Sequence, residues 1–489
     1  MEGRRYSTGR LPSAYLMSRS YAISIVETLR RQGHQAYLVG GCVRDLLLGR
    51  EPADYDISTD ATPDAVMRIF PQTYAVGVQF GVVLVPVPKD VAGGSSSKDN
   101  HHPGPPREEP LSGHQHKSLI EVATFRSDIG YSDGRHPDQV RFSRDPREDV
   151  ARRDFTINGL LLDPISNQVL DFVGGQRDLE QKTVRAIGNP KLRFTEDKLR
   201  MLRAVRFAAR FGYTICPATF SAVLELAGEI HQVSRERVRE ELTRMLTEGH
   251  ARQAFELLDG SRLLREVLPE IEAMKGVEQP PEFHPEGDVF THTLLLLENL
   301  PQPASVTLAW GALLHDVGKP PTFRRAPDRI RFDAHVSVGV RMAEAICRRL
   351  RFSNQETEQI LALVDNHMRF ADVERMKAST FKKFIRLPRF DEHLELHRLD
   401  CKSSHRNLRL YEFTRNKIAE LPEEAVRPAP LVSGEDLIAA GYRPGPVFKQ
   451  ILGSVEDAQL EGQLRTKNEA IEFIRRNFEA EQHFPPDRQ

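Results

Sequence analysis

A glycine pair followed by two closely spaced aspartates constrains the first part of this chain most strongly. Gly40 and Gly41 stand before a short apolar run, and Asp54 and Asp56 follow it, in LVGGCVRDLLLGREPADYDIST. Because alternate side chains of a strand point the same way, the two aspartates are expected to project together and share divalent metal ions. Glycine lets the backbone approach a ligand closely, and a helix over 42–48 offers free N–H groups to a phosphate. An Asp-x-Asp or a Gly-Gly alone is usually only a turn, but the combination favours metal-assisted transfer to or from a nucleotide.

The bulk composition indicates a large globular chain rather than a membrane protein. With 489 residues the chain is too long for one core and is expected to form three or four domains. Charged residues make up 28%, and no apolar run is long enough to cross a bilayer. The N-terminal segment is basic without a continuous hydrophobic stretch, so residues 1–18 are predicted to be a flexible arm rather than a secretory signal.

The net charge and the cysteine content bear on the expected partners and on the cellular location of the protein. The formal net charge is -1, which argues against coating nucleic acid by overall charge but leaves room for a local basic face. The four cysteines are scattered, with no Cys-x-x-Cys pair. A disulfide framework is therefore not expected, and a reducing cytoplasm is the predicted location. The oligomeric state is not predicted by these features.

Hydrophobic patterning predicts an α/β part at 19–173, which we call the head. Its expected elements are strands at 35–39, 54–58, 81–87, 119–125 and 139–142 and helices at 20–32 and 63–70. A Gly-, Ser-, Pro- and His-rich stretch at 88–118 interrupts it. This composition predicts a disordered insertion, and its histidines favour a solvated loop over a metal site.

From Gly174 onward no strand is predicted, and the pattern becomes all-helical. The expected divisions are a neck at 174–275, a histidine-rich domain at 276–416 and a C-terminal tail at 417–489. The fold class predicted is therefore an α/β head followed by all-α neck, histidine-rich and tail domains.

Two further groups in the head have the chemistry of a nucleotide site. Glu121, in SLIEVATFR, would be a third carboxylate beside the aspartates, although alone it is better explained as a solvent-facing strand residue. Arg152, Arg153 and Asp154 precede an apolar run. Guanidinium groups offer forked donors to phosphate or ribose, while a helix-capping charge cluster is the alternative.

A charged row in FTEDKLRMLRAVRF is suited to reading a base. Asp197 and Arg200 are three residues apart and are expected to share a helix face, which Arg203 and Arg206 extend. Aspartate only accepts and arginine only donates, so the first pair matches the amino group and ring nitrogen of both cytosine and adenine. Guanine and uracil place a carbonyl before the aspartate, at a cost on the order of 1–3 kcal/mol. The alternative is an amphipathic helix with an internal salt bridge.

Four motifs in one order resemble the class II tRNA nucleotidyltransferases of the polymerase β superfamily, which include the CCA-adding enzymes and bacterial poly(A) polymerases. The motifs are GGCVRD with DYD, EVATFR, RRDFTIN and EDKLRMLRAVRF, between residues 37 and 212, and SDGRHPDQVRF resembles the family's flexible loop. The resemblance implies a polymerase β-like mixed sheet in the head and a neck that faces tRNA.

The resemblance also implies roles for individual residues. Asp54 and Asp56 would bind Mg²⁺, with Glu121 as the third catalytic carboxylate, and Asp197 and Arg200 would select C or A. The implied nucleotide-binding set is Gly40, Gly41, Arg44, Arg153, Asp154, Asp197, Arg200, Arg203 and Arg206.

The implied activity is template-independent addition of CCA to tRNA from CTP and ATP. Poly(A) polymerases of the family typically carry a Gly-Arg-Arg-Phe-like stretch where this chain reads AVGVQFGVVLV, at 75–85, which favours tRNA as substrate. Specialists that add only CC or only A, and a poly(A) polymerase, stay open as alternatives. Gly159 stands where the family generally has alanine.

The histidine-rich domain carries a second constellation. LLHDVGKP resembles the signature of HD-domain phosphohydrolases, and spaced histidines and carboxylates accompany it: His292, His315, Asp316, His335, His367 and Asp400. Such ligands suit a divalent transition metal, Mn²⁺, Ni²⁺ or Fe²⁺. The resemblance implies phosphodiesterase or phosphatase activity, with terminal 2′,3′-cyclic phosphates as candidate substrates. The alternatives are that this body is only scaffold, that the hydrolase is the principal activity, or that the chain is a binding module without catalysis.

Overall fold

The computed structural model describes residues 13–87, 119–130 and 137–478. The insertion predicted at 88–118, most of the arm predicted at 1–18 and part of the predicted flexible loop lie outside these residues. The first helix, α1 (Ser13–Arg31), begins before the predicted start at residue 20. The described residues form two compact units: Met1–Glu241 with Glu256–Val267, and Leu242–Phe255 with Leu268–Gln489.

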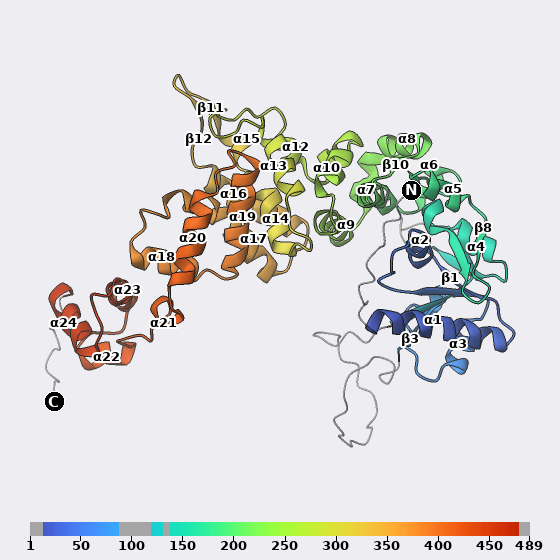
Figure 1. The fold of residues 1–489 in the computed structure, drawn as a ribbon, viewed down its shortest axis with the longest axis horizontal. Helices are drawn as coiled ribbons and strands as arrows, with labels where there is room; N and C mark the ends of the chain where they lie inside the picture. The colour runs from blue at the N-terminus through green and yellow to red at the C-terminus, as the bar shows by residue number, and fades with distance from the viewer. Residues whose placement is uncertain (1–12, 88–118, 131–136, 479–489) are drawn as a thin grey trace, which may run out of the picture. The chain divides into compact units, whose positions relative to one another are not determined.

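A six-stranded mixed sheet is the centre of the head, drawn from blue to green in Figure 1. Its strand order is β3-β4-β2-β1-β7-β8, and only the β2–β4 pair is parallel. The strands are β1 (Ala36–Val39), β2 (Asp56–Thr59), β3 (Val82–Pro86), β4 (Leu119–Thr124), β7 (Leu160–Asp163) and β8 (Gln168–Asp171). The mixed sheet predicted for the head is confirmed.

Short helices flank this sheet and position the motifs. Helix α1 packs along β1, and its apolar face includes the fully buried Val26 and Leu29. The short helix predicted after the glycine pair is present as α2 (Gly41–Leu47). The other elements of the head are α3 (Pro63–Ile69), η1 (Val78–Phe80), α4 (Pro146–Ala151), η2 (Thr156–Asn158) and a separate two-stranded ribbon of β5 (Arg126–Ile129) and β6 (Gln139–Phe142).

The neck region is mostly helical. Its helices are α5 (Gly175–Glu180), α6 (Pro190–Glu196), α7 (Leu199–Phe211), α8 (Pro217–Leu226), η3 (Ala227–Gln232), α9 (Arg235–Thr247), α10 (Ala251–Gly260) and α11 (Leu263–Val267). The prediction that strands end at Gly174 is wrong in detail. Two short strands, β9 (Thr183–Val184) and β10 (Thr214–Ile215), pair in parallel here, and two residues are too few to produce an alternating pattern.

The second unit is a helical body built around an apolar core. Trp310 is fully buried, and its indole N–H donates to the Thr243 hydroxyl at 2.9 Å. Its helices are α12 (Pro269–Glu272), α13 (Val289–Glu298), α14 (Val306–Leu314), α15 (Lys319–Thr322), α16 (His335–Arg349), α17 (Asn354–Asn366), η4 (His367–Asp372), α18 (Ala378–Ile385), α19 (Phe390–Ser403), α20 (Arg409–Glu420) and α21 (Glu423–Val426). One hairpin of β11 (Phe323–Arg325) and β12 (Ile330–Phe332) again departs from the predicted all-helical pattern.

The tail has a small core of its own. Helices α22 (Gly434–Ala439), α23 (Pro446–Leu460) and α24 (Lys467–Asn477) gather around apolar side chains that include Leu437 and Ile451. Among all described helices, none combines the length and the apolar character needed to span a membrane.

Candidate functional site

The three predicted carboxylates meet at one end of the β2–β4 pair. In the parallel register of these strands Asp56 stands directly opposite Glu121, where neighbouring strands lie about 4.8 Å apart. Asp54 is not part of the strand as predicted: β2 begins at Asp56, and Asp54 lies exposed in the preceding bend. Its charge raises the pKa of both other carboxyl groups, and its part in a shared metal site stays a prediction.

Mutual repulsion and burial change the acidity of this cluster. Burial raises the pKa of Asp56 first, and the charges of Glu121 and Asp54 raise it further, to about 7, against the opposing pull of Arg153. Burial likewise raises the pKa of Glu121, opposed by Arg153 and Arg152. Carboxylate oxygens crowded in this way are relieved by a bound cation, and they are the donors that Mg²⁺ prefers. The residues present therefore fit the magnesium site that the resemblance implied.

Basic side chains form the opposite wall of a pocket of about 190 Å³ at this site. The pocket is lined by Val39, Asp56, Ile57, Val82, Glu121, Ala123, Arg126, Arg152 and Arg153. Arg152 donates twice to the buried Asp149, at 2.9 and 2.7 Å, and Arg153 donates to its other oxygen at 3.2 Å. Asp149, which the sequence reasoning missed, thus holds both arginines beside the carboxylates.

The glycine pair lies next to this basic wall. Gly40 has φ of 80°, a backbone conformation that favours glycine, and a Cβ atom there would stand 3.1 Å from Arg153 Nη1, so a larger residue would also press on that arginine. Arg44 is nearly buried: its guanidinium donates to Asn158 at 2.6 Å and lies over the rings of Phe207 and Phe211. Contact of Gly41 and Arg44 with a phosphate stays a prediction.

Asp197 and Arg200 do not pair with each other. Asp197 lies between α6 and α7 rather than on one helix face with Arg200, and it accepts two hydrogen bonds from Arg237 of α9, at 3.2 and 2.8 Å. Arg200 instead donates to Glu196 at 2.7 Å and to the Arg152 carbonyl at 3.2 Å. The alternative of an internal Asp197–Arg200 salt bridge is wrong, and the sequence reasoning missed Arg237.

The remaining nucleotide-binding candidates are engaged in buried ion pairs. Arg203 donates to Asp154 at 2.9 and 2.6 Å, and Arg206 donates to Glu241 at 2.7 Å. Burial alone would raise the pKa of Asp154, but Arg203 and Asn158 lower it to about 2. The Asp154–Arg203 ion pair connects the head to α7. Each group is therefore engaged with the other and supports the structure of the site.

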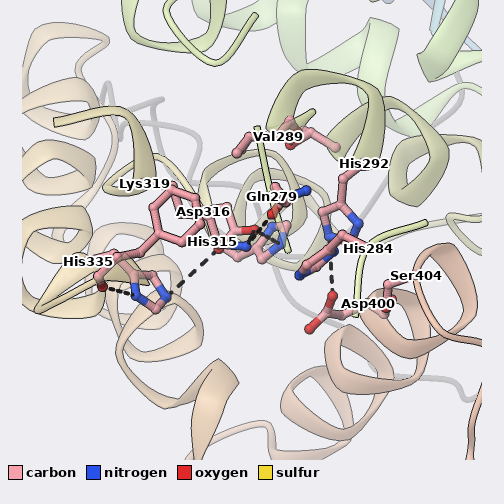
Figure 2. A network of polar contacts seen from close by, with 12 residues as sticks. Gln279, His284, Val289, His292, His315, Asp316, Lys319, His335, Asp400 and Ser404 are labelled. Atoms are coloured by element: carbon pink, nitrogen blue, oxygen red, sulfur yellow. Dashed lines mark hydrogen bonds and ion pairs between the residues drawn. The ribbon is translucent and has the colours of Figure 1, made fainter. Parts of the chain in front are cut away.

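The second constellation converges in the helical body of the second unit, as Figure 2 shows. Three imidazoles surround Asp316: its Oδ2 lies 3.2 Å from His315 Nε2, and its Oδ1 lies 4.0 Å from His335 Nε2 and 3.8 Å from His367 Nε2. His292 stands beside them, with its Nε2 3.2 Å from Asp400 Oδ1. All six predicted residues are therefore brought together.

Backbone carbonyls set the orientation of three of these imidazoles. The Nδ1 atoms of His315, His335 and His367 donate to the carbonyls of Ala312, Phe332 and Val364, at 2.9, 3.0 and 2.7 Å. A carbonyl can only accept, so in the neutral ring the hydrogen sits on Nδ1 and the Nε2 lone pair faces the cluster. These Nε2 atoms are buried without a hydrogen-bond partner, as metal ligands would be before the ion binds.

The donor atoms fall into groups that are compact enough to hold an ion. His292, His315 and Asp400 form one group, and Asp316, His335 and His367 form another, each with its ligand atoms within 4.8 Å of one another. Burial would raise the pKa of Asp316, but His315 and Lys319 hold it well below the ordinary range. Burial lowers the pKa of His367 to about 4, so this ring is neutral and available as a ligand at pH 7. The residues present fit a divalent transition metal.

A second layer supports this cluster and was missed by the sequence reasoning. Glu286 Oε1 lies 2.7 Å from His292 Nδ1 and 2.9 Å from His284 Nδ1. Lys319 lies 2.7 Å from Asp316 and donates to Gln279 at 2.6 Å. The segment EFHPEGDVFTH does contain closely spaced histidines and carboxylates, which is the signal that could have pointed to Glu286.

Three family models match successive parts of the chain. The model of the poly A polymerase head domain matches residues 36–185, a probable RNA and SrmB- binding site of polymerase A matches 212–275, and an HD domain matches 287–399. Fold and site together are similar to this succession of a polymerase-type head, an RNA-binding helical segment and an HD domain. The relatives that the chain resembles include proteins named CCA-adding enzyme.

The similarity to these relatives covers part of their length. The chain is 35% identical over 299 residues to the CCA-adding enzyme of Bacillus pumilus, which covers 61% of this chain and 64% of the relative. It is 39% identical over 255 residues to that of Oceanobacillus iheyensis, covering 52% and 56%. The matched segment thus spans less than two thirds of either relative. The crystal structure of the Bacillus stearothermophilus CCA-adding enzyme in complex with CTP is similar, with a TM-score of 0.68 and 27% identity over 94% of this chain and 97% of that chain.

Proposed function

We propose that this chain is a tRNA nucleotidyltransferase that adds CCA to tRNA 3′ ends from CTP and ATP without a nucleic-acid template. The observation that carries the proposal is that Asp56 and Glu121 stand opposite each other in a pocket that Arg152 and Arg153 also line, with the charge of Asp54 acting on both carboxyl groups. The family models and the relatives named CCA-adding enzyme support it. Its four buried cysteines are free, which is consistent with the predicted cytoplasmic location.

In this reaction, the site must stabilise both the charge that develops on the attacking hydroxyl oxygen and the negative charge of the phosphates. The 3′-hydroxyl oxygen of the RNA bonds to the α-phosphorus, the bond from that phosphorus to the bridging oxygen breaks, and pyrophosphate leaves while the hydroxyl gives up its proton. Asp54, Asp56 and Glu121 would hold Mg²⁺, which supplies a lowered hydroxyl pKa and neutralises phosphate charge when bound. Arg153, held by Asp149, is placed to donate to the nucleotide near this metal site.

Base selection is proposed for Asp197 and Arg200. Asp197 accepts from Arg237 with both oxygens and from the Leu199 N–H with Oδ1, so Oδ2 keeps a second lone pair for a base amino group. Arg237 would therefore hold the aspartate at a fixed angle while the base is read. Arg200, anchored by Glu196, keeps further N–H groups that can donate to the ring nitrogen of cytosine or adenine.

The test uses product length as its readout. Purified protein is incubated with labelled CTP or ATP and tRNA transcripts truncated before each nucleotide of the CCA end. Growth to the full CCA end and then arrest supports the proposal. Addition of only CC, only A or a long A tract would instead assign the chain to one of the alternative activities. Asp56→Ala should abolish incorporation, and the exposed Asp64→Ala is the matched control in the same domain.

A metal-dependent phosphohydrolase in the HD domain is the second candidate function. The observation that favours it is that the buried Nε2 atoms of four histidines face the carboxylates of Asp316 and Asp400: His292, His315, His335 and His367. Mn²⁺, Ni²⁺ or Fe²⁺ held by these residues with Asp316 and Asp400 would supply an activated water. Water oxygen bonds to phosphorus, one ester P–O bond breaks and the freed alcohol oxygen takes a proton, which opens a terminal 2′,3′-cyclic phosphate to a monoester.

This second activity is separable from the first. Metal-dependent hydrolysis that survives Asp54→Ala but is lost in His315→Ala would assign it to the HD domain. Loss in both variants, or in neither, would contradict the assignment. Metal content of the purified protein, measured by mass spectrometry, identifies the ion independently of turnover.

A further inference from the structure

A cavity of about 470 Å³ opens in the head and shares no lining residue with the pocket of the carboxylates. Its walls come from α1, from the end of α2 with the residues that follow it, and from the hairpin of β7 and β8. The volume is within the usual range for small-molecule sites. We call it the α2 cavity.

The α2 cavity has an apolar lining. Four aliphatic side chains provide it: Leu46, Leu47, Leu162 and Val169. Leu47 is 42% exposed, whereas Leu162 is nearly buried on the strand that pairs with β1. Such a lining can pack against the flat body of a ligand, for example a nucleobase, and remove both surfaces from water.

Four polar side chains of the α2 cavity keep hydrogen-bonding capacity that the described part of the chain does not use. Arg19 and Arg50 have no carboxylate partner among the described residues. Glu51 accepts from the Tyr55 hydroxyl with Oε1, at 2.7 Å, while its Oε2 and the Asn167 amide make no hydrogen bond to a described residue. Two guanidinium groups suit a phosphate, and a carboxylate with an amide suits the amino group and ring nitrogen of a base.

Glu51 connects the α2 cavity to the aspartates of the proposed metal site. Its partner Tyr55 is buried and stands between Asp54 and Asp56 in the chain. Burial raises the pKa of Tyr55 first and the hydrogen bond to Glu51 raises it further, against the opposing charge of Arg19, so the hydroxyl stays protonated and donates at pH 7. A ligand that binds Glu51 therefore changes how firmly the segment with the two aspartates is held.

We propose that the α2 cavity is an effector site for a nucleoside monophosphate, with the phosphate bound by Arg19 and Arg50 and the base against the aliphatic lining beside Glu51. The bound ligand holds Glu51 in place, which steadies Tyr55 and makes the aspartates bind Mg²⁺ more tightly. The effect on nucleotide addition rests on the proposed function, whereas binding of the ligand does not.

The first test measures binding alone, by equilibrium dialysis of the full-length protein with labelled adenosine 5′-phosphate (AMP). Arg19→Gln should lower the affinity about tenfold because a charge-assisted hydrogen bond is lost, and Leu47→Glu should lower it because the new carboxylate repels the phosphate. Arg31→Gln on the same helix as Arg19 and Leu192→Glu, at a site 65% exposed, are the matched controls and should bind as the wild type does. Equal affinity in all five proteins would overturn the site.

A comparison of ligands tests the chemical class. Ribose 5-phosphate and inorganic phosphate keep the anion but lack the base, so neither can use the apolar lining or Glu51 as AMP does. Each should bind about tenfold more weakly than AMP to the wild type. Equal affinity for all three ligands would overturn recognition of a nucleoside.

The second test measures the effect on nucleotide addition. Extension of a truncated tRNA with labelled CTP is followed against Mg²⁺ concentration, with and without AMP. AMP should lower the Mg²⁺ concentration for the half-maximal rate about fivefold in the wild type and in Arg31→Gln, but not in Arg19→Gln. Tyr55→Phe, which lacks the donor to Glu51, should bind AMP in dialysis without this shift.

The other outcomes are also decisive. A shift that persists in Tyr55→Phe would overturn the link through Glu51, and no shift in a wild type that binds AMP would overturn the effector role. Binding of AMP that depends on Arg19, in a protein that extends no tRNA, would support the site and count against the proposed function instead.

Discussion

Asp56 and Glu121 stand directly opposite each other on the parallel strands β2 and β4, although 65 residues separate them in the chain. Asp56 would be a weak acid here, since burial and the neighbouring carboxylates raise its pKa to about 7. A divalent ion between the two strands would restore the charged form. The opposed carboxyl groups therefore fit the divalent ion that the proposed function requires.

Removing this carboxylate should stop nucleotide incorporation. Asp56→Asn keeps the shape of the side chain but removes a ligand charge, so we expect kcat to fall by at least about 10²-fold. Gel-resolved extension of a truncated tRNA with labelled CTP measures it. Asp64→Asn, on the exposed face of α3, should retain full turnover. Near-normal extension by Asp56→Asn would show that the metal site is assigned wrongly.

The Arg237–Asp197 pair should govern base choice. Arg237→Ala removes both side-chain donors to Asp197 and leaves only the Leu199 N–H, so the carboxylate is held less firmly and guanine or uracil is rejected less strongly. We expect discrimination between correct and incorrect nucleotides to fall by about tenfold, the equivalent of about 1.4 kcal/mol. Incorporation of each of the four NTPs measures the ratio, and Glu240→Ala on the same helix is the control. Unchanged ratios in both Arg237→Ala and Asp197→Ala would refute selection by this aspartate.

The buried Asp154–Arg203 pair should contribute stability over a defined pH window. The pKa of Asp154 is lowered from 3.8 to about 2, so its contribution is complete above pH 3.8 and is lost as the pH falls through about 2. Asp154→Asn should therefore lower the free energy of unfolding at pH 7 by about 2–3 kcal/mol. Urea unfolding followed by circular dichroism gives this difference, with Asp64→Asn as control. A difference that is no smaller at pH 3 than at pH 7 would contradict the ion-pair explanation.

Glu286 should control metal affinity without being a ligand itself. Its Oε1 accepts from both His284 and His292, which orients the His292 ring toward the cluster. Since such outer partners are typically worth 10–100-fold in metal affinity, Glu286→Gln should weaken binding by about tenfold. Calorimetric titration of the metal-free protein with Mn²⁺ or Ni²⁺ measures it. Glu282→Gln, exposed in the same loop, is the matched control, and equal affinities in the two variants would exclude the role.

The motifs predicted the carboxylate site better than periodicity predicted its surroundings. Asp54, Asp56 and Glu121 meet as expected because the family resemblance supplied a long-range pairing that no local pattern contains. Periodic reasoning about helices can only join residues three or four apart, so it coupled Asp197 with Arg200 and missed Arg237, which lies on another helix. Tertiary packing decides which arginine pairs with Asp197, and the sequence alone does not show that this arginine is Arg237.

Two strands of the sheet were also missed for an identifiable reason. The run LLLD of β7 is buried and continuous, without the alternation that marks a half-exposed strand, and β8 is only four residues long. A short continuous apolar run is compatible with helix or strand, and pairing with β1 decides between them. The six histidines and aspartates named from the sequence lie together because each has the side chain of a metal ligand, whereas Glu286 and the carbonyls that orient the rings could not be identified in this way.

Arg44 connects the glycine turn of the head to helix α7. Its side chain leaves that turn and lies over the rings of Phe207 and Phe211, at 5.4 and 4.7 Å from their ring centres. Under the proposed function, the parts that would bind the triphosphate and the base are thereby held together, so a change from C to A would require the growing RNA end to move.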